Sequence, residues 1–297
     1  MWATRRVSPS PDIQDRLAMM VRNPGDDWRK RLVTMLFDLA GRFPGGDPLL
    51  PPLSMRRFVG EGSWIHGGRD FRANGLHFAE KFSKDARLIP DGSLLDVGSG
   101  CGRIAVPLTR FLKPTGRYAG LELSLPLVQW CSKHISLRYP NFRFIHCNLY
   151  SPFYNPQGSG DAANYAFPFD AGTFDVVAAT SVFTHLLPQA ATRYLQECSR
   201  VLASRGRLFA TFYLLDEGMP DVGHSITFDH ELAPHAFVND PANPEAAVGY
   251  RTRWILQEAE EAGFSLLSPI RWGPWAGRPF TYSGQDVLIL EKTSDRG

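Results

Sequence analysis

The sequence predicts an α/β fold: a seven-stranded, mostly parallel, doubly wound sheet with an antiparallel last strand and a helical N-terminal extension. Three observations lead to this prediction. From Ser93 onward, strand-like apolar runs alternate with helix-like runs, the order typical of a parallel sheet covered by helices on both faces. The last two strand-like runs are joined by a link too short for a crossover helix. Before residue 70 the apolar pattern is helical and is interrupted by Pro and Gly.

The composition is that of an ordinary globular enzyme, with 43% hydrophobic and 21% charged residues in a chain of 297. The 32 Lys and Arg against 30 Asp and Glu give no whole-protein attraction to nucleic acid or membranes. The 4 cysteines show no C-x-x-C spacing, which indicates buried thiols of a reduced protein rather than a zinc or redox site. Without a signal-peptide core or an apolar run long enough to span a membrane, we expect a cytoplasmic protein.

The expected N-terminal extension covers residues 1–69. In DDWRKRLVTMLFDLAG, residues 26–41, the apolar side chains share one helical stripe, with Asp26 in the N-cap position and Gly41 as terminator. PGGDPLLPP then breaks the chain. The run GSWIHGGRDFRANGLHF follows, and two interpretations stay open: a lid that excludes water from a ligand, or an entry loop and a core helix.

The expected main domain, residues 70–297, then adds the sheet strand by strand. The strand-like runs are SLLDV, GRYAGLEL, FRFIHC, FDVVAAT, GRLFATFYLL, FSLLSPI and DVLILEK. Helical patterns fall between them at 102–112, 125–139, 188–203 and 251–262. The link WGPWAGRPFTYSG leaves no room for a helix, so the strands at 264–270 and 286–292 should be antiparallel neighbours.

A long segment at about 216–250, after the fifth strand, lacks a clear helical or strand period. Long loops of this kind usually serve as lids or binding loops, so we expect a substrate-recognition insertion here. Its histidines, His224, His230 and His235, match no reliable ligand spacing. We therefore predict no catalytic metal.

A glycine loop follows the first strand in LLDVGSGCGRIAV, residues 94–106. The pattern D-x-G-x-G-x-G runs from Asp96 to Gly102, and glycine permits positive φ and close backbone approach to a ligand. The helix that follows can receive an anionic group at its N-terminus. The dinucleotide pattern G-x-G-x-x-G fails because Arg103 occupies its last position. A plain tight turn stays open as an alternative.

Polar groups also end the next two strands. Glu122 follows YAGL, where a carboxylate can accept both hydroxyls of a ribose, since an unpaired buried polar group costs about 1–3 kcal/mol. Asn148 and the backbone of Leu149 follow FRFIHC, where an amide can read an adenine edge. A surface glutamate that begins a loop is the alternative for Glu122.

Five segments together resemble the class I S-adenosylmethionine-dependent methyltransferases, of the bacterial small-molecule type: DVGSGCG, YAGLELS, HCNLY, FDVVAATSVFTHL and GRLFATFYLL. The resemblance covers roughly residues 70–292 and implies a seventh strand inserted antiparallel. It also implies S-adenosylmethionine as cofactor and a set of cofactor-binding residues: Asp96, Gly98, Ser99, Gly100, Gly102, Glu122, Leu123, Asn148, Leu149 and Thr180. Many members have Asp where this chain has Asn148, so we expect weaker charge assistance there.

The reaction implied by this resemblance, methyl transfer, is an in-line displacement that depends mainly on alignment of the reactants. His185, in SVFTHL, is the candidate catalytic residue, and two roles stay open: a base that takes a hydroxyl proton, or a histidine that hydrogen-bonds its loop. Substrate contacts are expected from Phe71, Tyr213, His224 and Trp275.

The favoured function is methyl transfer to an oxygen, of a hydroxyl or a carboxylate, on an apolar or aromatic metabolite. A nucleic-acid or protein methyltransferase is the alternative, but the chain has ATSVF where amino-methylating nucleic-acid enzymes carry N/D-P-P-Y/F, and no basic stripe is evident. A non-catalytic cofactor-binding partner protein is a further alternative. We expect a small-molecule substrate and no nucleic acid or membrane partner, with the oligomeric state, including a homodimer, left open.

Overall fold

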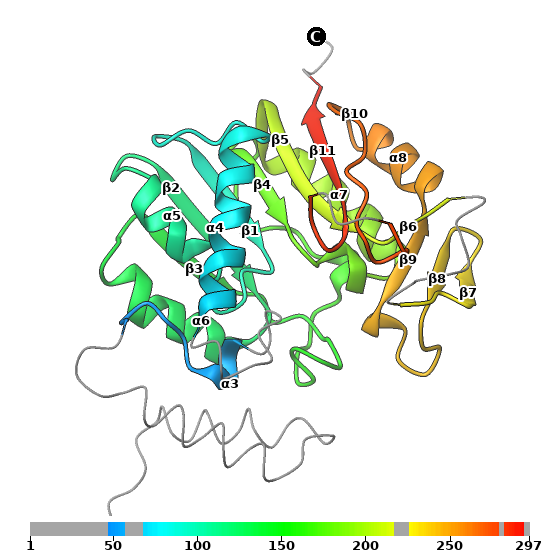
Figure 1. The fold of residues 1–297 in the computed structure, drawn as a ribbon, viewed down its shortest axis with the longest axis horizontal. Helices are drawn as coiled ribbons and strands as arrows, with labels where there is room; N and C mark the ends of the chain where they lie inside the picture. Colours follow the sequence, from blue (N-terminus) through cyan, green and yellow to red (C-terminus); the bar gives the residue numbers. More distant parts are fainter. Residues whose placement is uncertain (1–46, 57–67, 217–225, 279–281, 294–297) are drawn as a thin grey trace, which may run out of the picture.

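The computed structural model describes residues 47–56, 68–216, 226–278 and 282–293 (Figure 1). The predicted helix at 26–41, most of the expected extension and His224 therefore lie outside the described residues. Within the described ranges, no helix is both long and apolar enough to cross a membrane.

A 7-stranded sheet forms the centre of the molecule, with the order β10-β11-β5-β4-β1-β2-β3. Its strands are β1 (Ser93–Val97), β2 (Arg117–Glu122), β3 (Phe142–His146), β4 (Phe174–Ala179), β5 (Leu202–Phe212), β10 (Phe264–Leu266) and β11 (Asp286–Lys292). The pairs from β3 to β5 are parallel, whereas β11 is antiparallel to both β5 and β10. The predicted fold class and the antiparallel last strand are thus confirmed.

Successive strand residues face opposite sides of the sheet and so divide between two apolar cores. Leu94 and Val176 pack with α4 (Arg69–Lys84), α5 (Ala105–Phe111) and α6 (Leu125–Cys131) on one face. Their neighbours Leu95 and Val177 pack on the other face with α7 (Pro188–Val201) and α8 (Thr252–Glu261). Every residue of β1 is buried, as the continuous apolar run of a central parallel strand requires.

Several elements are shorter than their sequence patterns. The expected helix at 125–139 ends at Cys131 and continues as a π-helical turn, Ser132–Ser136. The strand expected at 264–270 ends at Leu266, shortly before Pro269, which cannot donate to a strand ladder. The helix expected from 102 begins at Ala105, because the glycine loop occupies the preceding positions in backbone conformations that a helix excludes.

The insertion after β5 contains regular structure that the sequence pattern did not predict. It forms a 4-stranded sheet, in the order β6-β9-β8-β7, of β6 (Leu214–Leu215), β9 (Val248–Arg251), β8 (Ala236–Val238) and β7 (His230–Ala233). A 3-10 turn, η5 (Pro244–Ala246), precedes β9. Strands of two to four residues are too short to show an alternating pattern, which explains why the sequence did not reveal them.

Candidate active site

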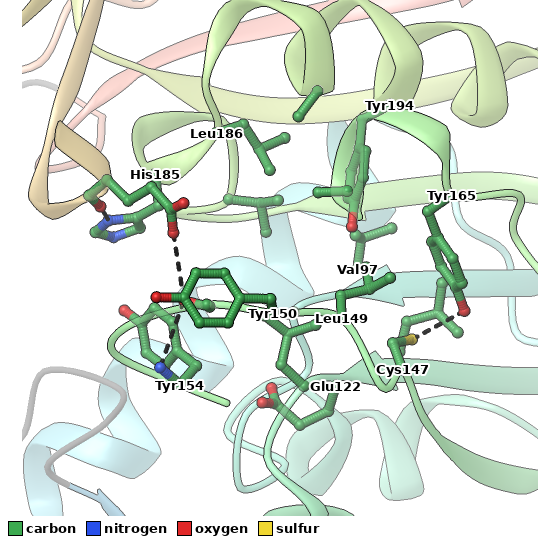
Figure 2. Close-up of a pocket in the computed structure, with 18 of the residues that line it drawn as sticks. Val97, Glu122, Cys147, Leu149, Tyr150, Tyr154, Tyr165, His185, Leu186 and Tyr194 are labelled. Carbon is green, nitrogen blue, oxygen red and sulfur yellow. Dashed lines mark hydrogen bonds between the residues drawn. The ribbon is translucent and has the colours of Figure 1, made fainter. Parts of the chain in front are cut away.

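A cavity of about 610 Å³ opens at the carboxyl ends of the parallel strands. Its walls come from the loops after β1, β2, β3 and β4, from α7 and from η5 of the insertion. Figure 2 shows the cavity with Glu122 on one side, His185 and Tyr154 at one end, and Tyr165 and Tyr194 at the other. This is the edge at which open α/β sheets bind their ligands.

The glycine loop contributes Gly98 and Gly100 to the cavity wall. Both have positive φ, 74° and 56°, and a Cβ on Gly98 would lie 2.8 Å from Val182 Cγ2. Gly102, with φ of 83°, is needed for packing, because its Cβ would lie 2.7 Å from Ile135 Cδ1. Among the predicted glycines, Gly98 and Gly100 therefore face the ligand space and Gly102 faces the core.

Asp96 and Ser99 lie beneath the loop and do not line the cavity. Asp96 is fully buried, and its Oδ2 accepts a hydrogen bond from the Tyr118 hydroxyl at 2.6 Å. Burial raises the pKa of Asp96 to about 7. The Ser99 N–H donates to the carbonyl oxygen of Leu121 at 3.0 Å. Asp96 is thus placed to hold the loop, a role that the resemblance also implies for it, and neither side chain lines the cavity.

Glu122 ends β2 and carries a buried carboxylate in the cavity wall. Its Oε2 accepts from the Gly100 N–H and its Oε1 from the Ser124 N–H, both at 2.8 Å. A carboxylate has about four acceptor positions, so two bonds leave capacity for ligand hydroxyls. Burial raises the pKa of Glu122, while these backbone donors act in the opposite direction.

The structure brings Leu123, Leu149 and Thr180 to the cavity but leaves Asn148 outside it. The Asn148 side chain is exposed, and its amide donates to Ser159 Oγ at 3.1 Å. We therefore withdraw the expected contact between the Asn148 side chain and an adenine.

Asp161 lines the cavity instead and was missed by the sequence reasoning. The chain leaves β3, loops out and returns, so that Leu149 and Gly160 form a parallel bridge. Asp161 is the N-cap of η3 (Ala162–Asn164), and its Oδ1 accepts from the Ala163 N–H at 3.0 Å. The turn-rich stretch SPFYNPQGSG is the sequence signal for this excursion.

Two distant segments meet over one end of the cavity, the loop after β3 and the turn η5. Ser151 Oγ donates to Glu245 Oε2 at 3.5 Å, and both residues line the cavity. The Tyr154 ring meets the His185 ring edge-on, with centroids 5.9 Å apart. Burial raises the pKa of Glu245. Sequence reasoning missed these contacts because they join residues far apart in the chain.

His185 lies in η4 (Phe183–His185) and lines the cavity. Its Nδ1 is 2.9 Å from the carbonyl oxygen of Glu245. Because a carbonyl oxygen only accepts, Nδ1 must carry the proton of a neutral ring, which leaves the lone pair on Nε2. Burial lowers the pKa of His185 below 6.5 and so favours the neutral ring at pH 7.

The turn after β4 places Thr180 and Ser181 in the cavity wall. Ser181 has φ of 57°, unusual for a residue other than glycine. Its N–H donates to Thr211 Oγ1 at 2.7 Å, and its hydroxyl donates to Gln285 Oε1 at 3.0 Å. These bonds, to Thr211 of β5 and to Gln285 directly before β11, hold the turn at the carboxyl edge of the sheet.

Of the aromatic residues expected at the substrate, Phe71 and Trp275 are buried in the core and Tyr213 is half-buried outside the cavity wall. Phe71 is buried on the inner face of α4. The Trp275 indole N–H donates to Asp286 Oδ2 at 2.7 Å, and its ring packs against Tyr213 with centroids 5.1 Å apart. None of these aromatic residues lines the cavity, and His224 lies outside the described residues. The predicted substrate contacts of Phe71, Tyr213 and Trp275 are therefore not supported, whereas that of His224 stays a prediction.

In the part of the chain that the structure describes, no cluster of His, Cys, Asp and Glu side chains could hold a metal ion. The expected absence of a metal stays a prediction, since His224 and Asp221 fall outside that part.

Residues 95–210 match the protein family described as "Methyltransferase domain". The central part of this chain is thus a methyltransferase domain. The chain is similar in fold to the PH0226 protein of Pyrococcus horikoshii OT3, with a TM-score of 0.50 and 17% identity over 78% of this chain and 93% of that one.

A second similar structure comes from Galdieria sulphuraria, a protein assigned provisionally as a sarcosine dimethylglycine methyltransferase. Its TM-score is 0.51 and its identity 15%, over 74% of this chain and 86% of that one. At such identities the similarity concerns the fold alone.

The residues at the cavity fit the cofactor of this class. Positions Gly98 and Gly100 let a ligand reach the backbone, and Glu122 offers a buried carboxylate one strand away. Leu123 and Leu149 supply apolar contact beyond it, toward Asp161.

Proposed function

We propose that this methyltransferase methylates an oxygen of a small apolar or aromatic molecule, with His185 as the base for a hydroxyl acceptor. The observation that carries the proposal is the His185 ring in the cavity, with Nδ1 bound to the Glu245 carbonyl at 2.9 Å. Nε2 of the neutral ring then has the free lone pair that a general base needs.

In this proposal Gly98 and Gly100 lie against the methionine part of the cofactor and Glu122 accepts from the ribose hydroxyls. Asp161, rather than Asn148, accepts from the adenine amine, because it lines the cavity and Asn148 does not. When bound, S-adenosylmethionine supplies a methyl group already activated on a sulfonium. The protein has then to orient the acceptor, exclude water and, for a hydroxyl, take its proton at His185 Nε2.

The dimensions and lining of the cavity support a small acceptor. Its 610 Å³ has to hold both the cofactor and the acceptor, so the space left beside the cofactor suits a small molecule. Tyr150 and Tyr154 from the loop after β3 and Glu245 from the insertion border it. Glu245 supports the predicted role of segment 216–250 in substrate recognition. The lid function of residues 1–69, the homodimer and the cytoplasmic location stay predictions.

The test uses acceptors that share one apolar body: 4-phenylphenol, biphenyl-4-carboxylic acid and 4-aminobiphenyl, with product identified by mass spectrometry. We expect methylation of the phenol, and a loss of about 10²- to 10⁴-fold in His185→Gln. Because burial lowers the His185 pKa, the wild-type rate should be flat above pH 7 and fall below pH 6.5.

The control variant is His134→Gln, since His134 stacks on Trp130 and lies outside the cavity wall. It should keep wild-type turnover of the phenol. Methylation of the amine alone, or full activity of His185→Gln on the phenol, contradicts the proposal. Calorimetry with S-adenosylhomocysteine tests cofactor binding separately and should give the same affinity for both histidine variants.

A further inference from the structure

One recess of the cavity lies between α7 and η3, away from His185 (Figure 2). Leu187, Ala190 and Tyr194 recur at helical spacing along α7 and face it. Ala162 and Ala163 form the opposite wall, and α7 packs closely against η3. Small alanine side chains on both walls leave a slot suited to a flat ring.

Tyr194 projects a polar atom into this apolar slot. Its side chain is 6% exposed, and its ring is fixed edge-on against Phe167 with centroids 5.2 Å apart. Figure 2 shows its hydroxyl directed into the cavity. No hydrogen bond to this hydroxyl comes from the residues that the structure describes. Burial is the largest cause of the raised pKa of Tyr194, and the neighbouring Cys147, Tyr165 and Cys198 raise it further. The hydroxyl therefore stays protonated and able to donate.

The neighbouring Tyr165 behaves differently. Its hydroxyl lines the same recess but already donates to Cys147 Sγ at 3.2 Å. An unpaired buried hydroxyl costs about 1–3 kcal/mol, whereas a paired one does not carry this penalty. Of the two phenols in the recess, Tyr194 is thus the one whose hydroxyl faces the cavity without an acceptor from the described residues.

We propose that the Tyr194 hydroxyl donates a hydrogen bond to a ring nitrogen of the cofactor's adenine. The inference rests on the proposed function, which puts the sugar at Glu122 and the adenine amine at Asp161. Asp161 directly precedes η3, whose alanines form one wall of the slot, so an adenine held there faces α7. Ring nitrogens of adenine only accept, which matches a donor hydroxyl.

The test measures S-adenosylhomocysteine binding by calorimetry for wild type, Tyr194→Phe and Tyr165→Phe. We expect about five- to fiftyfold weaker binding for Tyr194→Phe, the loss of one buried hydrogen bond. Tyr165→Phe, the matched control, should stay within about twofold, since its hydroxyl pairs with the protein. Without ligand, Tyr194→Phe should melt no lower than wild type, whereas Tyr165→Phe should melt lower.

Three ligand analogues, with adenine replaced by 1-deaza-, 3-deaza- or 7-deazaadenine, identify the nitrogen. One analogue, which lacks the nitrogen that accepts from Tyr194, should bind wild type more weakly than S-adenosylhomocysteine does. The affinity of Tyr194→Phe for this analogue should equal that of wild type. Equal affinity of wild type for all three analogues and S-adenosylhomocysteine, or unchanged binding by a folded Tyr194→Phe, overturns the inference. Wild type that fails to bind S-adenosylhomocysteine at all overturns the proposed cofactor arrangement first, and this inference with it.

Discussion

At the scale of single residues, a fully buried carboxylate supports the glycine loop. Asp96 lies at the end of β1, and its only hydrogen bond among the described side chains comes from Tyr118 of the neighbouring strand β2. Asp96 Oδ1 is buried among atoms that offer it no hydrogen bond in the described part of the chain. Burial disfavours the charged form and raises the pKa of Asp96 to about 7.

This raised pKa predicts a pH-dependent stability. Between pH 3.8 and about 7 the Asp96 carboxyl is protonated in the folded protein and ionised in the unfolded chain. The stability that this proton contributes is therefore lost as pH rises through 7. Relative to Asp96→Asn, wild type should lose about 2–3 kcal/mol of unfolding free energy from pH 5 to pH 8, measured by urea denaturation. Exposed Asp91, whose pKa is lowered by Lys113, should show no such slope in Asp91→Asn. Parallel profiles for wild type and Asp96→Asn would disprove the assignment.

At the scale of elements, the turn after β4 is held by β5 and by Gln285, the residue directly before β11. Gln285 Oε1 accepts from both Ser181 and Thr211 hydroxyls, at 3.0 and 2.7 Å. Thr211 Oγ1 in turn accepts from the Ser181 N–H. This closed group of hydrogen bonds maintains a positive φ at Ser181 that a non-glycine residue adopts only at a cost.

Gln285→Leu should therefore loosen the turn. We expect a loss of about 1–3 kcal/mol of unfolding free energy from two hydrogen bonds, and weaker S-adenosylhomocysteine binding because Thr180 and Ser181 line the cavity. Ser181→Gly, which relieves the strain, should recover part of both losses in the Gln285→Leu background. Gln257→Leu, at an exposed position of α8, is the control. Strict additivity of the two substitutions would show that strain at Ser181 is unimportant.

At the scale of the whole molecule, Asp286 joins the main sheet to the insertion. Its fully buried carboxylate begins β11. It accepts from the N–H of Leu214 in β6 at 2.8 Å, from the N–H of Gly273 at 2.7 Å and from the Trp275 indole. One side chain thus fixes the second sheet, the link before β11 and the Trp275 cluster with respect to one another.

Asp286→Asn is expected to cost about 3–5 kcal/mol of unfolding free energy. The carboxylate of Asp286 has two acceptor oxygens for its buried donors, whereas the amide of Asn has only one. Hydrogen exchange should rise at β6 and β9 before it rises at β1. Asp240→Asn, an exposed acid of the same insertion, should change stability by less than about 1 kcal/mol. An equally small effect of Asp286→Asn would argue against this coupling.

Local patterns in the sequence determined most of the fold. The alternation of apolar runs predicted every strand of the main sheet, and the short link before β11 predicted its antiparallel direction. Gly98, Gly100 and Glu122 could be located because loops that follow parallel strands reach one common edge. Each of these signals depends on residues close together in the chain.

Only the tertiary structure decided which other side chains reach the cavity. Asp161 takes the place expected for Asn148 after a loop excursion, Glu245 orients His185 from a distant insertion, and Tyr194 of α7 faces the ligand space. Phe71, an aromatic residue predicted to contact the substrate, packs in the core instead. Such contacts depend on how separate elements pack against one another, and no local periodicity or spacing records that packing.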